Sequence, residues 1–275
     1  MGFEVIEGEI RTIWAPINFA NSAATVYQGS IVMSSLASSV PAGEGLLAIG
    51  ASAGKSDTTG KAVPFGVVLG FNTENNGTYS STYKGNYVVT AGTQAAQQAR
   101  TGTRLAEGMA AKGDPLYWGK VAVIGPSTVL KGPIFNGAYG TAPTAYSNTA
   151  ASTDGSTLTT SAISNAYLAY NGTWYCRSGA NRGLYRTAYD TSTTVHTFRT
   201  AWPQDIAVGD SFVLASLRIG TCAAQFDSAS TYIEQMPSYA TNYYLIDVLE
   251  INLETSGKEY AIFKFNADQF CGVRA

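Results

Sequence analysis

Short stretches in which apolar and polar residues alternate run along most of the chain, and turn residues separate them. A period of two places one face of each stretch against a core and the other in solvent, as in a half-buried β-strand. The N-terminal half has such stretches at residues 24–33, 45–49, 62–71, 87–90, 116–124 and 128–135. The C-terminal half has them at residues 166–170, 173–177, 184–189, 195–200, 211–219, 221–226, 232–234, 243–252 and 260–265. Many short strands without helices between them predict antiparallel sandwich or barrel domains.

The segment KGDPLYWGKVAVIGPSTVLKGPIF, residues 112–135, predicts a hairpin that closes an N-terminal β domain. It holds two turn sequences, Gly-Asp-Pro and Gly-Pro-Ser, and an apolar run follows each of them. The next residues, 136–164, are nearly free of charge and rich in small residues and threonine. We expect them to be a linker or long surface loop, with an extended arm lying on a partner as the alternative. The sequence thus predicts an all-β protein of two antiparallel β-sandwich or barrel domains, residues 1–135 and 165–275, joined by this linker.

Two other segments have a less uniform pattern. Residues 94–111 have the only helix-like composition, but two glycines interrupt it, and a strand over residues 104–110 is an equal alternative. Residues 1–14 predict a first strand that places Ile10, Thr12 and Trp14 on one face. Such a terminal strand usually lies at the edge of its own sheet, and less often adds to the sheet of a neighbouring molecule. We expect no signal peptide here, since the segment carries glutamates, and no run in the chain approaches the ~18 apolar residues of a membrane span.

Composition favours a protein that assembles with others. The chain has 275 residues, enough for two domains, and 13% of them are charged, against ~25% in an average globular domain. With 29 glycines, 17 tyrosines and many hydroxyl side chains, the surface is expected to be neutral and to lose little hydration when it is covered. The net charge of −2 argues against nucleic-acid binding, which needs basic stripes.

Candidate catalytic and metal-ligating residues are few. His196 is the only histidine, so a serine or cysteine hydrolase of the usual kind would have to use it. It lies in a predicted strand without a nucleophile elbow or an orienting acid beside it. Cys176, Cys222 and Cys271 are far apart and form no CxxC pair, so we expect reduced thiols and no zinc site. We therefore expect no enzyme, no metal and no cofactor.

The segment GASAGKS, residues 50–56, resembles a phosphate-binding loop but lacks its spacing. That motif needs four residues between its glycines, and only three separate Gly50 from Gly54. We expect a glycine-rich surface loop. Asp114 and Asp210 each follow a glycine and are expected to cap turns.

Aromatic residues offer a different kind of site. Seventeen tyrosines and four tryptophans exceed what two small cores need, and aromatic β surfaces can bind sugars or proteins. Trp174, Tyr175 and Trp202 are candidates for stacking on a glycan, with core packing as the ordinary alternative.

Three pieces of the N-terminal half follow one another in a characteristic order. YQGSIV at residues 27–32 opens a strand with glycine, PFGVVLG at 64–70 is a Gly-Val-Val strand, and KGDPLYW at 112–118 leads from a Gly-Asp-Pro turn into an apolar strand. In this respect residues 15–135 resemble the small barrel of the capsid decoration, or cement, proteins of tailed bacteriophages. DIAVGD at residues 205–210 looks like part of an added, outward-facing β domain of a virion protein.

The resemblance implies a structural role without catalytic residues. The chain would be made in the host cytoplasm and would bind the outer surface of the capsid, bridging major capsid subunits and touching neighbouring copies of itself, with no nucleic-acid or membrane partner. The candidate partner contacts are Ile10, Thr12, Trp14 and Trp118. The first alternative is a receptor- or glycan-binding module of a tail fibre or baseplate, with the stacking residues named above. A wall-degrading hydrolase is the least favoured class.

Overall fold

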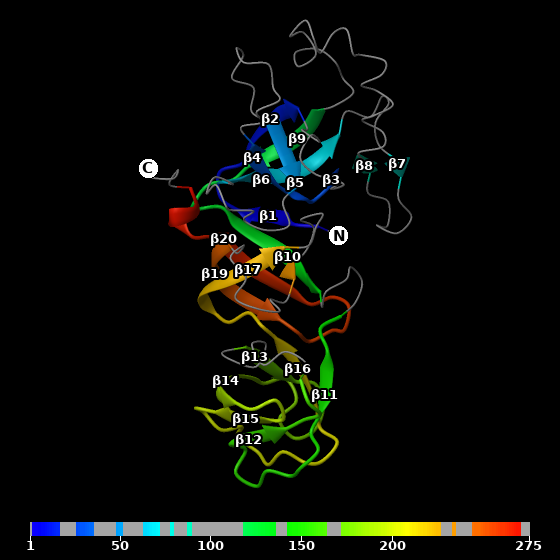
Figure 1. Cartoon of the computed structure of the whole chain (residues 1–275), viewed down its shortest axis with the longest axis vertical. Helices are drawn as coiled ribbons and strands as arrows, with labels where there is room; N and C mark the ends of the chain where they lie inside the picture. Colours follow the sequence, from blue (N-terminus) through cyan, green and yellow to red (C-terminus); the bar gives the residue numbers. More distant parts are fainter. Residues whose placement is uncertain are drawn as a thin grey trace, which may run out of the picture. The chain divides into compact units, whose positions relative to one another are not determined.

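The protein is all-β, as the alternation predicts. The computed structural model describes residues 2–16, 26–35, 48–51, 63–71, 78–79, 87–89, 118–135, 142–163, 172–226, 233–234 and 244–270. Most neighbouring strands in it are antiparallel (Figure 1). The helix-like segment 94–111 and most of the loop 50–56 lie outside the described residues. Within them the only helical element is a 3-10 turn, η3 (Ala267–Gln269), and no helix is long and apolar enough to cross a membrane.

The chain divides into two compact units whose boundaries differ from the predicted domains. Unit 1 consists of residues 1–132, 226–232 and 264–275, and unit 2 of residues 133–225 and 233–263. The prediction placed continuous domains on either side of a linker. Three of the four observed boundaries instead fall inside strands, namely β10, β17 and β20. The reason is that the last strands of the chain join the same sheet as the first strand, in the order β1-β10-β18-β17-β19-β20. Sequence position alone cannot reveal such long-range pairing.

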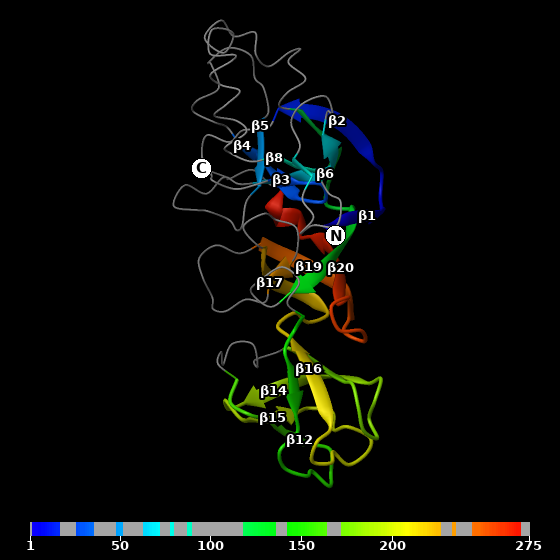
Figure 2. The same cartoon turned by 90° about the vertical axis from the view of Figure 1, so that its right-hand side faces the viewer.

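Unit 1 contains a five-stranded sheet in the order β2-β9-β6-β4-β5 and a three-stranded sheet in the order β3-β8-β7 (Figure 1). Figure 2 shows β2, β4, β5 and β6 of the first sheet from a second direction. Its strands are β1 (Glu4–Glu7), β2 (Arg11–Pro16), β3 (Val26–Tyr27), β4 (Ile31–Ser35), β5 (Ala48–Ala51), β6 (Val63–Phe71), β7 (Thr78–Tyr79), β8 (Tyr87–Val89) and β9 (Trp118–Val123). Valines at inward positions, Val32, Val67 and Val121 among them, are buried, as expected for β-branched residues on a half-buried sheet.

Gly29 divides the predicted strand 24–33 into β3 and β4. Its φ of +84° lies in the left-handed region, which glycine adopts without a steric penalty. A Cβ at this position would also collide with the backbone of Gly2. The glycine therefore lets the N-terminal segment pass directly beside the turn.

The predicted hairpin over residues 112–135 is wrong in its pairing. Its two strands form close to where they were expected, as β9 and β10 (Val129–Phe135), and Thr128 N–H donates to the Gly125 carbonyl over 3.0 Å in the turn between them. However, β9 pairs with β2 on one side and with β6 on the other, so β10 is not its neighbour. The turn sends the chain from one sheet to another.

Unit 2 contains a six-stranded sheet in the order β11-β16-β13-β14-β15-β12 (Figure 1). Its strands are β11 (Ala145–Ser147), β12 (Thr157–Thr159), β13 (Thr173–Cys176), β14 (Tyr185–Thr191), β15 (Val195–Phe198) and β16 (Ser211–Ala215). An apolar cluster packs against this sheet and includes Leu158, Trp174, Phe198, Trp202 and Phe212. The remaining strands, which complete the sheet begun by β1 and β10, are β17 (Gly220–Phe226), β18 (Ile233–Glu234), β19 (Tyr244–Asn252) and β20 (Tyr260–Phe265).

The expected linker 136–164 is a structural part of unit 2. Residues 142–163 supply β11 and β12, which pair antiparallel with β16 and β15 at the two ends of the sheet. Buried Asn148 joins this segment to the turn before β16, because its amide donates to the carbonyls of Ala150 and Ala207 over 2.7 and 2.9 Å. Small residues and threonines are common in linkers and also suit short edge strands. Composition alone therefore does not distinguish the two. Both the linker and the partner-arm interpretations are wrong for the described residues.

Candidate functional site

The first candidate surface is the N-terminal edge, residues 4–12, which comprises β1 and the start of β2. In the described part of the chain β1 is the last strand of its sheet and pairs with β10. All nine side-chain positions are exposed or half-buried, and Ile6 and Ile10 have 46% and 54% of their surface in solvent. An edge strand with exposed apolar side chains is a template for another chain unless something covers it.

The N-terminal edge is also acidic. Its charged residues are Glu4, Glu7, Glu9 and Arg11, which give the segment a formal charge of −2. Glu4 lies opposite Lys131 of β10 in the strand register, where opposite charges on one face attract. A partner that covers the two isoleucines is therefore expected to present basic groups around an apolar centre.

Phe3 fixes this edge to unit 1. Its ring is buried and meets Phe226 edge-on at a centroid distance of 5.2 Å. Its N–H donates to the Gly29 carbonyl over 2.8 Å. The exposed strand β1 thus starts from a buried aromatic anchor, which holds it in place without a partner.

The predicted partner contacts are divided between exposed and undescribed side chains. Ile10 and Thr12 are exposed. Trp14 and Trp118 lie in β2 and β9, which pair along their length, and their side chains lie outside the described residues. The single strand predicted over residues 1–14 is in fact two strands, β1 and β2. Each lies at the edge of a sheet of its own chain, as expected for a terminal strand. The structure adds Ile6, which the sequence reasoning missed.

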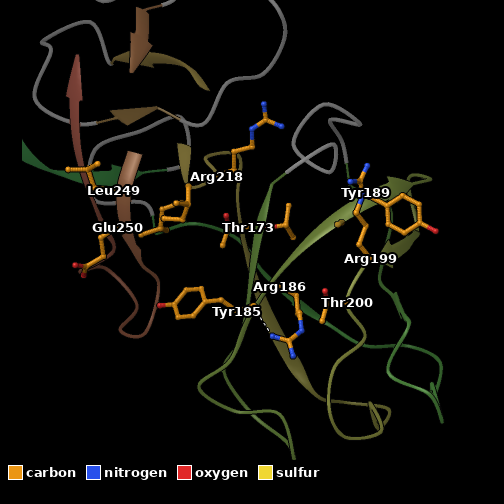
Figure 3. Close-up of a pocket in the computed structure, with 13 residues that line it drawn as sticks. Thr173, Tyr185, Arg186, Tyr189, Arg199, Thr200, Arg218, Leu249 and Glu250 are labelled. Carbon is orange, nitrogen blue, oxygen red and sulfur yellow. Dashed lines mark hydrogen bonds between the residues drawn. The ribbon is translucent and has the colours of Figure 1, made fainter. Parts of the chain in front are cut away.

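The second candidate surface is a groove of about 770 Å³ in unit 2, between β14 and β19. Figure 3 shows Tyr189 and Arg199 together on one side of it and Leu249 and Glu250 on the other. Its lining is Thr173, Tyr185, Arg186, Thr187, Ala188, Tyr189, Arg199, Thr200, Arg218, Ile219, Leu249, Glu250 and Ile251. Charged, hydroxyl and apolar groups therefore meet in one depression.

The proposed glycan-stacking residues do not lie on a surface. Trp174 and Trp202 belong to the apolar cluster of unit 2 and are buried, and Tyr175 is buried as well. Trp202 packs edge-on against Phe198 and Phe212 at 5.5 and 5.2 Å. The stacking hypothesis is wrong for these side chains, because rings with at most 6% of their surface in solvent leave no face open to a sugar. Core packing, the ordinary alternative, describes them.

His196 is a buried, neutral core residue. Its Nε2 lies 3.0 Å from Thr160 Oγ1, and its ring packs on Trp174 with centroids 4.8 Å apart. Its Nδ1 has no hydrogen-bond partner among the described residues. Burial lowers the pKa of His196 from 6.5 to about 4, because desolvation disfavours the imidazolium. No described carboxylate bonds to it, so the geometry lacks the orienting acid of a catalytic triad.

The thiols and polar clusters offer no reactive centre in the described part of the chain. Cys176 and Cys222 are free thiols, and Cys176 donates to the Ser178 carbonyl over 2.9 Å. Burial, reinforced by the charge of Asp210, raises the pKa of Cys176 to about 11, so it is not a thiolate at neutral pH. No group of three or more His, Cys, Asp or Glu side chains could hold a metal among the residues described. Cys271 lies outside them.

Asp210 caps a turn, as predicted from its position after Gly209. Its Oδ2 accepts the N–H of Ala207 over 2.9 Å. Asp114, the second predicted capping residue, lies outside the described residues.

Comparison of the chain with family models, with curated proteins and with solved structures finds no match.

Sequence reasoning missed the residues that border the groove. Tyr189, Arg199 and Arg218 come from β14, from the segment after β15 and from the turn before β17. Nothing in their spacing indicates that they meet. The sequence carries no signal for a basic groove, because residues 186–218 contain three arginines and also three aspartates.

Proposed function

We propose that this chain is a structural protein of a tailed-phage virion that binds the outer face of the capsid and bridges neighbouring major capsid subunits. The virion assignment rests on the resemblance of residues 15–135 to capsid decoration proteins. The structural observation that supports a protein-binding role is the N-terminal edge, where β1 exposes Ile6 and the adjacent Ile10 beside an unpaired strand edge in the described chain.

Two kinds of contact are available at this edge. A strand of the partner can pair with β1 through main-chain hydrogen bonds, and pockets of the partner can take up the isoleucines. Burying an isoleucine side chain is worth about 1.5–3 kcal/mol, so a single contact of this size is weak. On a capsid lattice, several such contacts per molecule act together, and the second contact becomes intramolecular. Several weak contacts of this kind are therefore enough for stable decoration of the capsid.

The test must alter the edge without removing it. Deleting residues 1–14 would also remove the buried anchor Phe3 and most of strand β2, so a loss of binding could reflect unfolding. The better variant is Ile6→Glu with Ile10→Glu, which adds charge only at exposed positions. The control is Val208→Glu, which adds one charge at an apolar position in unit 2 that is more exposed, at 65%, than either isoleucine.

The binding partner for this test is the capsid assembled from the major capsid protein of the same genome, without decoration. We expect the double variant to co-sediment with these capsids at least tenfold more weakly than the parent chain, and Val208→Glu to bind like the parent. Circular dichroism melting checks that all three are folded. Full binding by the double variant would show that the N-terminal edge is not part of the capsid interface.

A further inference from the structure

We propose that unit 2 carries a separate binding site, for an acidic polysaccharide, in the groove between β14 and β19. This goes beyond capsid binding, because the groove and the N-terminal edge share no residue. The ligand class follows from the charge, the apolar side chains and the hydroxyl groups of the groove.

Apolar side chains concentrate at this groove. Tyr189, Ile219 and Leu249 are exposed by 47%, 60% and 49%, and all three line it. Single exposed apolar residues are ordinary, but several that line one depression together with polar groups indicate a binding surface. Tyr189 offers a flat ring on which the C–H face of a sugar can pack, while its hydroxyl stays in solvent.

The local charge of the groove is opposite in sign to the net charge of the chain. Its charged side chains are Arg186, Arg199, Arg218 and Glu250, a formal local charge of +2 in a chain whose net charge is −2. Neither Arg199 nor Arg218 makes a side-chain hydrogen bond or ion pair with any residue in the described part of the chain. Their guanidinium groups are therefore available for carboxylates or sulfates, which they can bind in a bidentate manner.

Two of the arginines are held in position. Arg186 donates to the Tyr185 carbonyl over 2.9 Å (Figure 3) and to the Ala201 carbonyl over 3.1 Å. Its guanidinium lies 5.6 Å from the ring centre of Trp202. Arg199 lies 5.7 Å from the ring centre of Tyr189, a cation–π arrangement. Because these side chains are already ordered, binding loses less conformational entropy.

The groove suits a sugar chain better than an acidic peptide. An extended peptide binds best along an open sheet edge, but β14 lies between β13 and β15, and β19 lies between β17 and β20. The walls therefore offer side chains instead of free main-chain groups. Thr187 and Thr200 provide hydroxyls for sugar hydroxyl groups, and Glu250, whose Oε1 accepts from Tyr260 over 3.1 Å, provides an oriented acceptor.

The experiment measures binding of the full chain to three soluble polymers at low salt: oligogalacturonate for carboxylates, dextran sulfate for sulfates, and neutral dextran. We expect binding to at least one acidic polymer, weakening as salt is added, and none to dextran. The two acidic probes separate the carboxylate and sulfate sources of the negative charge. Absence of binding to both, or equal binding to dextran, would overturn the proposal.

Variants locate the site. Arg199→Ala with Arg218→Ala should weaken binding by tenfold or more, since each lost charged hydrogen bond is worth that factor or more, and Tyr189→Ala should weaken it severalfold. The charge-matched control is Arg182→Ala with Lys258→Ala, which removes two exposed cations of unit 2 that do not line the groove. Equal losses of binding in the two double variants would show that the groove is not the site. Poly-glutamate serves as an acidic peptide probe, and its binding more strongly than the acidic sugars would contradict the proposed ligand class. Capsid co-sedimentation of the arginine variant should stay unchanged, so this proposal and the proposed function fail independently.

Discussion

The ring of Phe3 fills the space beside Gly132 that any larger side chain would need. A Cβ built on Gly132 would overlap Cε1 and Cδ1 of the Phe3 ring. The glycine lies in β10, next to the Lys131 position that pairs with β1. The close contact between Phe3, just before β1, and Gly132 of β10 therefore holds the N-terminal edge in place.

Gly132→Ala should destabilise unit 1 by about 1–3 kcal/mol, because overpacking forces the ring or the backbone to move. The effect should be local to the N-terminal edge, so the Phe3 amide, bonded to Gly29 O, should exchange faster with solvent. Urea unfolding followed by hydrogen exchange measures both quantities. The control is Gly125→Ala, since a Cβ there meets nothing within 4 Å. Equal stability of the Gly132 and Gly125 variants would contradict the tight contact.

Acid should destabilise unit 2 through His196. Its folded-state pKa is lowered from 6.5 to about 4, so the unfolded chain binds the proton more readily between these values. The stability that the neutral imidazole provides is fully present above pH 6.5 and is lost as the pH falls toward 4, by about 3 kcal/mol in all.

The chain offers a direct check, because it contains a single histidine. The one imidazole signal in a proton NMR titration should move with a midpoint near pH 4 in the folded protein. His196→Asn should flatten the acid limb of the stability profile relative to the parent chain. A midpoint near 6.5 in the folded state would show that the ring is hydrated.

A buried ion pair should make Arg177 important for stability. Arg177 bonds to Glu259 Oε1 at 2.5 Å and to the Leu253 carbonyl, and the Glu259 side chain is fully buried. Arg177→Met leaves this carboxylate without a counter-charge, which typically costs about 3–5 kcal/mol. The double variant Arg177→Met with Glu259→Leu removes both charges and should recover most of the loss.

Urea unfolding of the two single variants and the double variant forms a thermodynamic cycle. A strong favourable coupling between the two sites is the expected result. Additive losses would mean that the two side chains act independently in solution.

Strand positions could be predicted from the sequence, but their partners could not. The alternation over residues 211–219 and 260–265 is local information, and β16 and β20 form there. Pairing depends on contacts distant in sequence, such as β11 with β16, so the linker interpretation of residues 136–164 failed. The sequence pattern of residues 136–164 does not indicate which strands they pair with.

The candidate sites were harder to predict than the fold for the same reason. Trp174 and Trp202 were natural candidates as large aromatic side chains, yet whether a ring faces core or solvent depends on what packs against that face of the sheet. Tyr189 looked no different in sequence and is exposed beside Arg199. The sequence shows only that no nucleophile elbow or orienting acid lies beside His196 in the chain. Its position in the core, packed on Trp174, depends on strand pairing distant in sequence.

The most direct test of the central proposal is a cryo-EM map of undecorated capsids of the same genome mixed with the purified chain. We predict saturable density at symmetry-related lattice positions, with the N-terminal edge of unit 1 against the shell and the density absent for Ile6→Glu with Ile10→Glu. An empty lattice at saturating concentration, or contact through unit 2 alone, would contradict the account.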